Sequence, residues 1–252
     1  MRPVLVGMVA VAALLVGCGP GRRSIDWAGL MRKVRGPSDR ELLEQLKSPD
    51  PDLRRSAIER LSRKKAYRRG PWPGLYAAKV KDEDATVRIA ALRALAQCGE
   101  NQCGEKRYLP DVLAALKCPT RESPGEPDPA VRWAAAAALD SFYDERAAGP
   151  LMAALAADPD GRVRAAAAKA LRHHRRREVL EALVEAVERD GEFLVRYNSA
   201  ESLRELTGRQ IGTDAERWRE VIAAGPAATQ PARRAKRPWW DWFGLTVKGK
   251  GQ

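Results

Sequence analysis

The chain has 252 residues, with 45 Lys and Arg against 33 Asp and Glu, and a formal net charge of +12. Hydrophobic residues make up 44% and charged residues 31%, which excludes both a disordered chain and a protein with many membrane spans. Alanine supplies 42 residues, whereas Ile, Thr, Tyr and Phe together supply 19, so residues that pack well in sheets are scarce. We therefore expect a helical fold and no β-sandwich or barrel.

The first twenty residues, MRPVLVGMVAVAALLVGCGP, follow the pattern of a secretory signal. Arg2 precedes an apolar run at 4–16 that is shorter than the ~20 residues of a membrane span. The run ends in Leu15-Val16-Gly17-Cys18, which resembles the lipobox of bacterial lipoproteins. The resemblance implies that a signal peptide, 1–17, is removed, that Cys18 is lipidated, and that 18–38 forms a linker. The alternative is an ordinary signal peptide or a short uncleaved anchor.

One sequence pattern recurs five times in the middle of the chain. The copies are DPDLRRSAIERL at 50–61, DATVRIAALRAL at 84–95, DPAVRWAAAAAL at 128–139, DGRVRAAAAKAL at 160–171 and EFLVRYNSAESL at 192–203. Each has an arginine, an acid four residues before it, an aliphatic residue directly before it, and a leucine seven residues after it. The acids and arginines are Asp50 and Arg54, Asp84 and Arg88, Asp128 and Arg132, Asp160 and Arg164, and Glu192 and Arg196. Agreement at four offsets in five copies indicates an internal repeat.

The offsets describe one helix per copy. Aspartate caps exposed N–H groups at a helix start, and apolar or small residues then recur at the spacing of one helix face. A shorter apolar run precedes each copy, so the predicted unit is a helical hairpin that buries its face by stacking on the next. The sequence predicts an all-α fold, an α-solenoid of about five hairpins. We expect residues 118–127 to form a loop insertion and residues 213–224 a closing helix, with Thr213 as N-cap and Trp218 facing inward.

The D-x-x-[VL]-R-x-x-A-x-x-A-L segments resemble HEAT repeats, specifically the short HEAT-like repeat also found in bilin lyases. The resemblance covers residues 39–208 and, with the closing helix, gives a repeat domain at 39–224. It implies that the ten repeated acids and arginines form a hydrogen-bonded ladder along the solenoid. The fifth copy departs from the pattern at Glu192, Asn198 and Ser199, as terminal repeats commonly do.

Few residues offer a basis for catalysis or for binding a metal. Cys98 and Cys103 are a candidate disulfide in an exported protein, leaving Cys118 unpaired, and unpaired thiols are the alternative. A thiolate metal site lacks a fourth ligand nearby. His173-His174 reads as a solvated basic helix end, because cations complement the helix dipole there. We expect neither enzymatic activity nor a metal or other cofactor.

Basic residues gather in two places. Residues 54–69 hold eight Lys and Arg and a single Glu. The C-terminal tail, 225–252, begins with a Pro/Ala-rich linker and continues with six Lys and Arg and one Asp. Within it lie four basic residues, Arg233, Arg234, Lys236 and Arg237, and four aromatic residues, Trp239, Trp240, Trp242 and Phe243. These eight residues are a candidate contact with a partner or membrane, and folding back onto the last repeat is the alternative.

These features together predict a lipid-anchored, non-enzymatic scaffold at a bacterial membrane, on the periplasmic side or in the outer membrane. Its concave face would bind a protein or peptide of the cell envelope. One alternative is an adaptor that grips anionic lipid or envelope polymer through its basic surfaces. Another is an accessory enzyme related to bilin lyases, which the export signal disfavours. We expect no nucleic-acid partner.

Overall fold

The computed structural model describes residues 36–98, 106–121, 123–141 and 143–224. These residues form helices and no strand, and they belong almost entirely to a compact unit that starts at Asp39. The first helices of the hairpins are α3 (Asp39–Gln45), α5 (Trp72–Lys79), α7 (Leu109–Leu116), α9 (Ala148–Ala157) and α11 (Arg177–Arg189). The second helices are α4 (Pro51–Ser62), α6 (Ala85–Cys98), α8 (Pro129–Ser141), α10 (Gly161–Ala170) and α12 (Phe193–Thr207).

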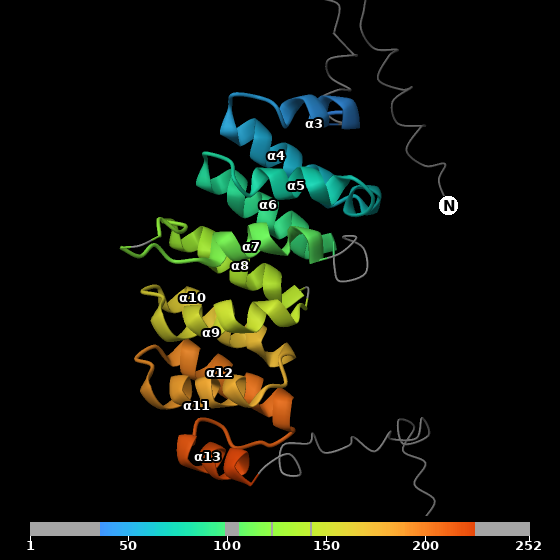
Figure 1. Ribbon diagram of the computed structural model, residues 1–252. Coiled ribbons are helices and arrows are strands. Elements are labelled where there is room, and N and C mark those ends of the chain that lie inside the picture. The colour runs from blue at the N-terminus through green and yellow to red at the C-terminus, as the bar shows by residue number, and fades with distance from the viewer. Residues whose placement is uncertain (1–35, 99–105, 122, 142, 225–252) are drawn as a thin grey trace, which may run out of the picture. The chain divides into compact units, whose positions relative to one another are not determined.

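The hairpins follow one another in chain order, and each second helix packs against the next, from α4 to α12 (Figure 1). A last helix, α13 (Ala215–Ala223), packs against α11. Short 3-10 turns precede four of the first helices: η2 (Lys65–Arg68), η3 (Lys106–Tyr108), η4 (Glu145–Ala147) and η5 (Leu171–His173). The prediction of an α-solenoid built from five helical hairpins is confirmed.

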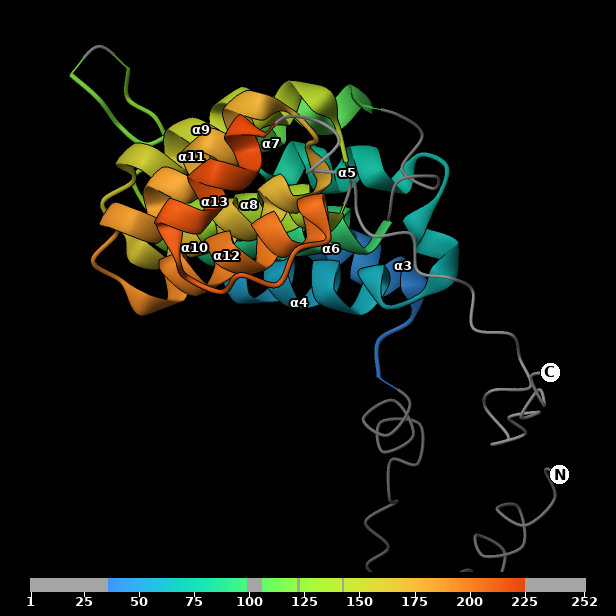
Figure 2. The same cartoon turned by 90° about the horizontal axis from the view of Figure 1, so that it is seen from below.

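Small and branched residues of the second helices form most of the core. The leucines seven residues after each repeated arginine are all buried: Leu61, Leu95, Leu139, Leu171 and Leu203. Alanines such as Ala91, Ala135 and Ala167 are fully buried between neighbouring second helices. Because alanine projects little beyond the backbone, adjacent second helices pack closely, and Figure 2 shows them as a separate layer from the first helices.

The repeated aspartates start the second helices. Asp50, Asp84, Asp128 and Asp160 each accept a backbone N–H from the residue two positions later, at 2.7–2.9 Å. A hydrogen bond from Arg162 lowers the pKa of Asp160 to about 2. The side chain of Glu192 makes no such cap on α12.

The closing helix differs from the prediction at its first residue. Its N-cap is Asp214, which accepts the N–H of Arg217, and Thr213 lies one position too early. Trp218 is fully buried, as expected, and its Nε1 donates to the carbonyl of Gly212 at 2.8 Å.

The predicted insertion forms the long loop between α7 and α8, the helices of the third hairpin. The loop folds back on itself, because Glu126 N donates to Lys117 O at 2.7 Å. Gly125 has a φ of +50°, and a Cβ there would lie 2.6 Å from the backbone of Cys118 and of Lys117. Only glycine suits that turn without strain.

Candidate binding surfaces

The five repeated arginines lie at the loops inside each hairpin. In every copy, Nη1 donates to the carbonyls six and five residues earlier, at 2.8–3.4 Å. The same guanidinium then reaches an acid of the next hairpin in four cases: Arg54 to Asp82, Arg88 to Glu126, Arg132 to Asp158, and Arg164 to Asp190, at 2.7–2.8 Å. An arginine ladder therefore joins consecutive hairpins.

The ladder acids differ from those the repeat pattern suggested. Asp50, Asp84, Asp128 and Asp160 cap helices, while the ladder uses acids two positions earlier, at offset −6 from the next arginine. The two sets are linked, because the ladder acids accept the backbone N–H of Asp84, Asp128, Asp160 and Glu192. The predicted ladder was therefore wrong about which acids take part and right about the arginines.

Burial of the ladder is greatest at its centre. The side chains of Arg132 and Asp158 are 3% and 0% exposed and form two parallel hydrogen bonds, at 2.7 and 3.0 Å. The hydrogen bond to Asp158 raises the pKa of Arg132, against the effect of burial. Because both side chains are almost fully buried and form two parallel hydrogen bonds, this pair holds consecutive hairpins together.

The second helices present an outward face, defined by the first and fifth residues after each repeated arginine. Trp133 of α8 lies on this face, 37% exposed, and the guanidinium of Arg93 of α6 lies 5.9 Å from its ring centroid. Ile89 is half-buried beside Arg93, and Tyr197 of α12 is exposed. The face therefore combines exposed aromatic rings with a cation. Sequence reasoning missed it, because residue type varies at this offset.

A second exposed apolar group lies at the start of α12, the last second helix. Phe193 is 66% exposed and Tyr197 48% exposed, and their rings stack with centroids 6.1 Å apart. Leu194 beside them is also exposed. The closing helix does not bury them, because it packs against the first helix, α11.

Exposed cations gather where second helices end and first helices begin. Six have no ion pair with any residue in the part of the chain that the structure describes: Arg40, Arg60, Arg63, Lys65, Arg107 and Arg175. We call this set the basic edge. The opposite edge carries the ladder, in which acids and arginines pair with one another, so the unpaired positive charge lies on the basic edge.

The sequence predicts that both adjacent histidines are solvated, but the structure exposes only one of them. His174 is 1% exposed, and its ring lies 5.0 Å from that of Tyr143. Burial lowers its pKa, and the carboxylate of Glu145, 3.7 Å from Nδ1, opposes the shift. His173 is exposed and bonds the carbonyl of Asp140 at 3.0 Å. The error arose because the contacts with Tyr143 and Glu145 come from the neighbouring hairpin.

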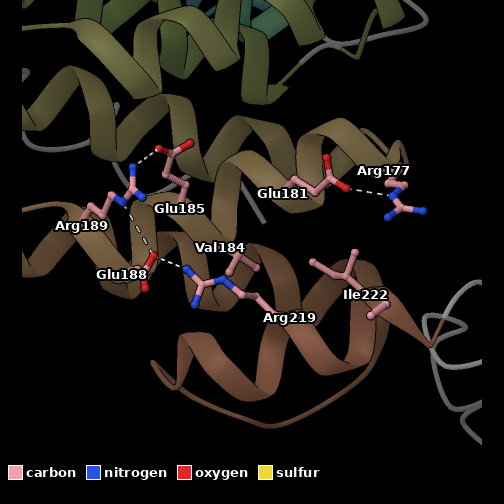
Figure 3. A pocket seen from close by; sticks show the side chains of 9 residues that line it. Arg177, Glu181, Val184, Glu185, Glu188, Arg189, Arg219 and Ile222 are labelled. Atoms are coloured by element: carbon pink, nitrogen blue, oxygen red, sulfur yellow. Dashed lines mark hydrogen bonds and ion pairs between the residues drawn. The ribbon is translucent and has the colours of Figure 1, made fainter.

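Figure 3 shows a groove of about 400 Å³ between α11 and α13. Its charged side chains are paired with one another: Arg177 with Glu181 and Arg189 with Glu185, both at 2.8 Å, and Arg219 with Glu188. The only apolar side chains labelled there are Val184 and Ile222. The ion pair between Arg219 and Glu188 joins the closing helix to α11 across this groove.

A more apolar cavity, of about 460 Å³, lies between α7, α9 and the insertion loop. Leu113, Leu116, Pro150 and Ala153 line it, with the half-buried Cys118 at the loop. Within the described ranges, no group of three or more His, Cys, Asp or Glu side chains could hold a metal ion. None of the described helices is both long and apolar enough to cross a membrane.

Several predicted site residues cannot be placed. Cys18, Cys103 and the eight tail residues lie outside the described residues, so lipidation, the Cys98–Cys103 disulfide and the tail contact stay predictions. Cys98 itself is buried, and its Sγ donates to the carbonyl of Ala94 at 3.3 Å. Of the predicted set, the structure describes the ladder arginines, which pair with other acids than expected, and the capping acids, which accept backbone N–H groups.

Comparison with known proteins agrees with this architecture. The family model described as HEAT repeats matches residues 73–172 and 149–216, more than half of the chain. The chain therefore belongs to the HEAT-repeat family. No curated protein matches it.

Three solved structures are similar in fold. A designed armadillo repeat protein aligns with a TM-score of 0.50 and 18% identity, over 75% of this chain and 93% of its own. An engineered protein aligns with a TM-score of 0.49 and 18% identity, over 75% and 86%. The complex of CpcE and CpcF of phycocyanin lyase from Nostoc aligns with a TM-score of 0.42 and 22% identity, over 62% and 90%. Of the three, only the armadillo repeat protein reaches a TM-score of 0.50, and at 18% identity its likeness shows the fold alone.

Proposed function

We propose that this protein is a lipid-anchored, non-enzymatic HEAT-repeat scaffold that binds a protein or peptide partner in the bacterial cell envelope. The partner lies on the outward face of the second helices, and lipid on Cys18 holds the chain at the membrane. HEAT repeats present such faces to partners, and fold alone names no partner.

The single observation that carries the proposal is Trp133 on that face. A tryptophan left 37% exposed in the middle of a helical layer, with the guanidinium of Arg93 beside its ring, is the residue combination enriched at the centres of protein interfaces. In the neighbouring helix α10 the matching residues are Ala165, which is 2% exposed, and the exposed Lys169, so no large apolar side chain of α10 lies at these positions.

Site-specific photo-crosslinking in intact cells tests the partner face. A photoreactive residue at position 133 should give a defined protein adduct, whereas the same residue at Leu75 should give none. Leu75 is a matched control, because it is similarly exposed but lies on the first helix α5. Adducts of equal yield at both positions would contradict the proposal.

The anchor has its own test. Replacing Cys18 with Ser should remove the lipid, which membrane fractionation and the mass of the mature chain would report. Several acyl chains bind a membrane durably, whereas a single chain binds it only marginally, so most of the protein should leave the membrane fraction. Unchanged partitioning together with an unchanged mass would refute lipidation at Cys18.

A second candidate function is binding of anionic lipid by the basic edge. Asp39, the first residue of the compact unit, bonds Lys64 and the hydroxyl of Tyr67, so this unit begins at the basic edge. Each cation near an anionic surface contributes about 1 kcal/mol, roughly fivefold in affinity.

Vesicle sedimentation separates this candidate from the first. In a Cys18→Ser chain of residues 18–252, neutralising Arg60, Arg63 and Lys65 with Gln should weaken binding to phosphatidylglycerol vesicles by up to about 100-fold. The control variant neutralises three cations outside the basic edge, Lys47, Lys81 and Arg162, and changes net charge equally. Equal effects of the two variants would exclude the basic edge as a lipid site.

A further inference from the structure

The arginine ladder is open at its C-terminal end. Arg54, Arg88, Arg132 and Arg164 each pair with an acid of the following hairpin. Arg196 makes the same two carbonyl bonds through Nη1, at 2.8 and 2.9 Å, but its Nε and Nη2 meet no acceptor among the described residues. No sixth hairpin follows α12 within the described residues, since α13 packs on α11. The guanidinium therefore presents two N–H directions to solvent.

The fourth repeat shows which residues lie beside a ladder arginine that has a following hairpin. A Cβ on Gly161, three residues before Arg164, would lie 2.7 Å from Glu192 Cγ and 3.5 Å from Arg164 Nη2. The residue at this offset therefore contacts both its own ladder arginine and the loop of the next hairpin. Phe193 holds the same offset from Arg196. It should therefore contact whatever supplies an acid to Arg196.

Tyr197 extends the same surface. Its equivalent in the fourth repeat, Ala165, is 2% exposed, and its carbonyl accepts Asn198 Nδ2 of α12 at 2.9 Å. In the fourth repeat the next second helix, α12, thus covers this position. The fourth repeat has the small residues Gly161 and Ala165 at these two positions. The fifth repeat has large aromatic residues there, Phe193 in place of Gly161 and Tyr197 in place of Ala165. We call Phe193, Arg196 and Tyr197 the open end.

The chemistry of the open end defines its occupant as a carboxylate flanked by large apolar side chains. A planar guanidinium with two free N–H directions suits a carboxylate in a bidentate arrangement, and stacked rings favour further aromatic contacts. The C-terminal tail carries such a segment. Residues 239–243 read Trp-Trp-Asp-Trp-Phe, and Asp241 is the only acid among residues 225–252.

We propose that residues 239–243 of the chain's own tail bind the open end, with the carboxylate of Asp241 accepting hydrogen bonds from Arg196. The tryptophans flanking Asp241 cover Phe193 and Tyr197. Asp241 thereby takes the place that Asp82, Glu126, Asp158 and Asp190 hold in the ladder. The tail completes the last repeat, and its basic residues 233–237 precede the docked segment.

The chain is long enough for this contact. Residues 225–240 separate the end of the described stack from Asp241, and at about 3.3 Å per residue they reach roughly 50 Å. Helix α12, with 15 residues, is about 22 Å long at 1.5 Å per residue. A connection of this length gives the two sites an effective concentration near the millimolar range, so weak contacts suffice.

Hydrogen exchange on the mature chain tests the proposal. In the unlipidated 18–252 chain, the backbone amides of residues 195–200 should exchange about tenfold faster after Asp241→Asn, and about as much faster after Arg196→Gln. The double variant should be no faster than either single one, because both remove the same contact. Asp241→Asn touches no described residue, so its effect is not due to a damaged repeat.

A control arginine lies on the same helix. Arg204 pairs with Glu201 at 2.8 Å, so Arg204→Gln should add its own effect to that of Asp241→Asn without coupling. Unchanged exchange at 195–200 after Asp241→Asn, or after removal of residues 233–252, overturns the proposal. So does full additivity of Arg196→Gln and Asp241→Asn. Binding of the tail to a membrane or a partner at the expense of the open end would appear as the first of these results.

Discussion

The buried ion pair between Arg132 and Asp158 should be the ladder contact whose loss is most costly. Replacing Asp158 with Asn keeps the shape but leaves the arginine charge, 3% exposed, without a counter-charge. Breaking such a buried pair costs about 3–5 kcal/mol. The matched control is Glu181→Gln, which breaks a pair of similar length, 2.8 Å, whose side chains are 54% and 73% exposed. Exposed pairs of this kind contribute about 0–1 kcal/mol.

Thermal unfolding distinguishes the two variants. For a domain of this size, 1 kcal/mol shifts Tm by about 2–4 °C, so Asp158→Asn should lower Tm by roughly 6–20 °C and Glu181→Gln by less than about 4 °C. A double variant, Arg132→Met with Asp158→Leu, should recover much of the loss, because an apolar pair removes the buried charge. Equal losses for Asp158→Asn and Glu181→Gln would refute the assignment of the ladder as the contact that joins hairpins.

Three further outcomes are expected. Gly125→Ala should speed tryptic cleavage of the insertion loop about tenfold, since a positive φ and a backbone clash together cost about 1–2 kcal/mol. Gly149→Ala is the control and should not change the cleavage rate, because its Cβ would meet nothing within 4 Å. Trp218→Ala should cost about 3–5 kcal/mol in urea unfolding, because it empties a fully buried site under the closing helix; a loss below 1 kcal/mol would show that α13 is dispensable. The pKa of His174 is lowered in the folded state, so the unfolded chain binds its proton first as pH falls. The free energy of unfolding should therefore decrease below about pH 6.5, by at most about 1.4 kcal/mol per pH unit. His174→Phe should flatten that slope.

The repeat pattern predicted the fold well because its offsets reflect local physics. A capping aspartate, an aliphatic residue and a leucine seven residues after the arginine fix one helix and its buried face, and these features recur in every copy except that Glu192 of the fifth makes no cap. The ladder acids were missed although four of the five residues at offset −6 are acids. The first copy has Ser48 at this offset, and the later copies have Asp82, Glu126, Asp158 and Asp190. The acid at offset −4 is present in all five copies, so the pattern favoured that residue, which caps the helix, as the partner of the arginine.

The candidate surfaces could not be predicted in the same way. Residues at the first offset after the arginine are Arg55, Ile89, Trp133, Ala165 and Tyr197, which share no chemistry and so gave no periodic signal. Exposure of Trp133, and burial of His174 against Tyr143, depend on how neighbouring hairpins pack. Arg196 is distinguished from the other arginines only because no hairpin follows it up to residue 224, where the described residues end, and a single repeat does not reveal this.

Radical footprinting of the chain in native membranes would test the central claim, that a protein occupies the second-helix face, most directly. The measured quantity is the oxidation rate of Trp133, compared with its rate in the purified, unlipidated chain of residues 18–252. The account predicts strong protection of Trp133 in the membrane sample and an unchanged rate at Leu75 on α5. Equal oxidation of Trp133 in both samples would contradict the account.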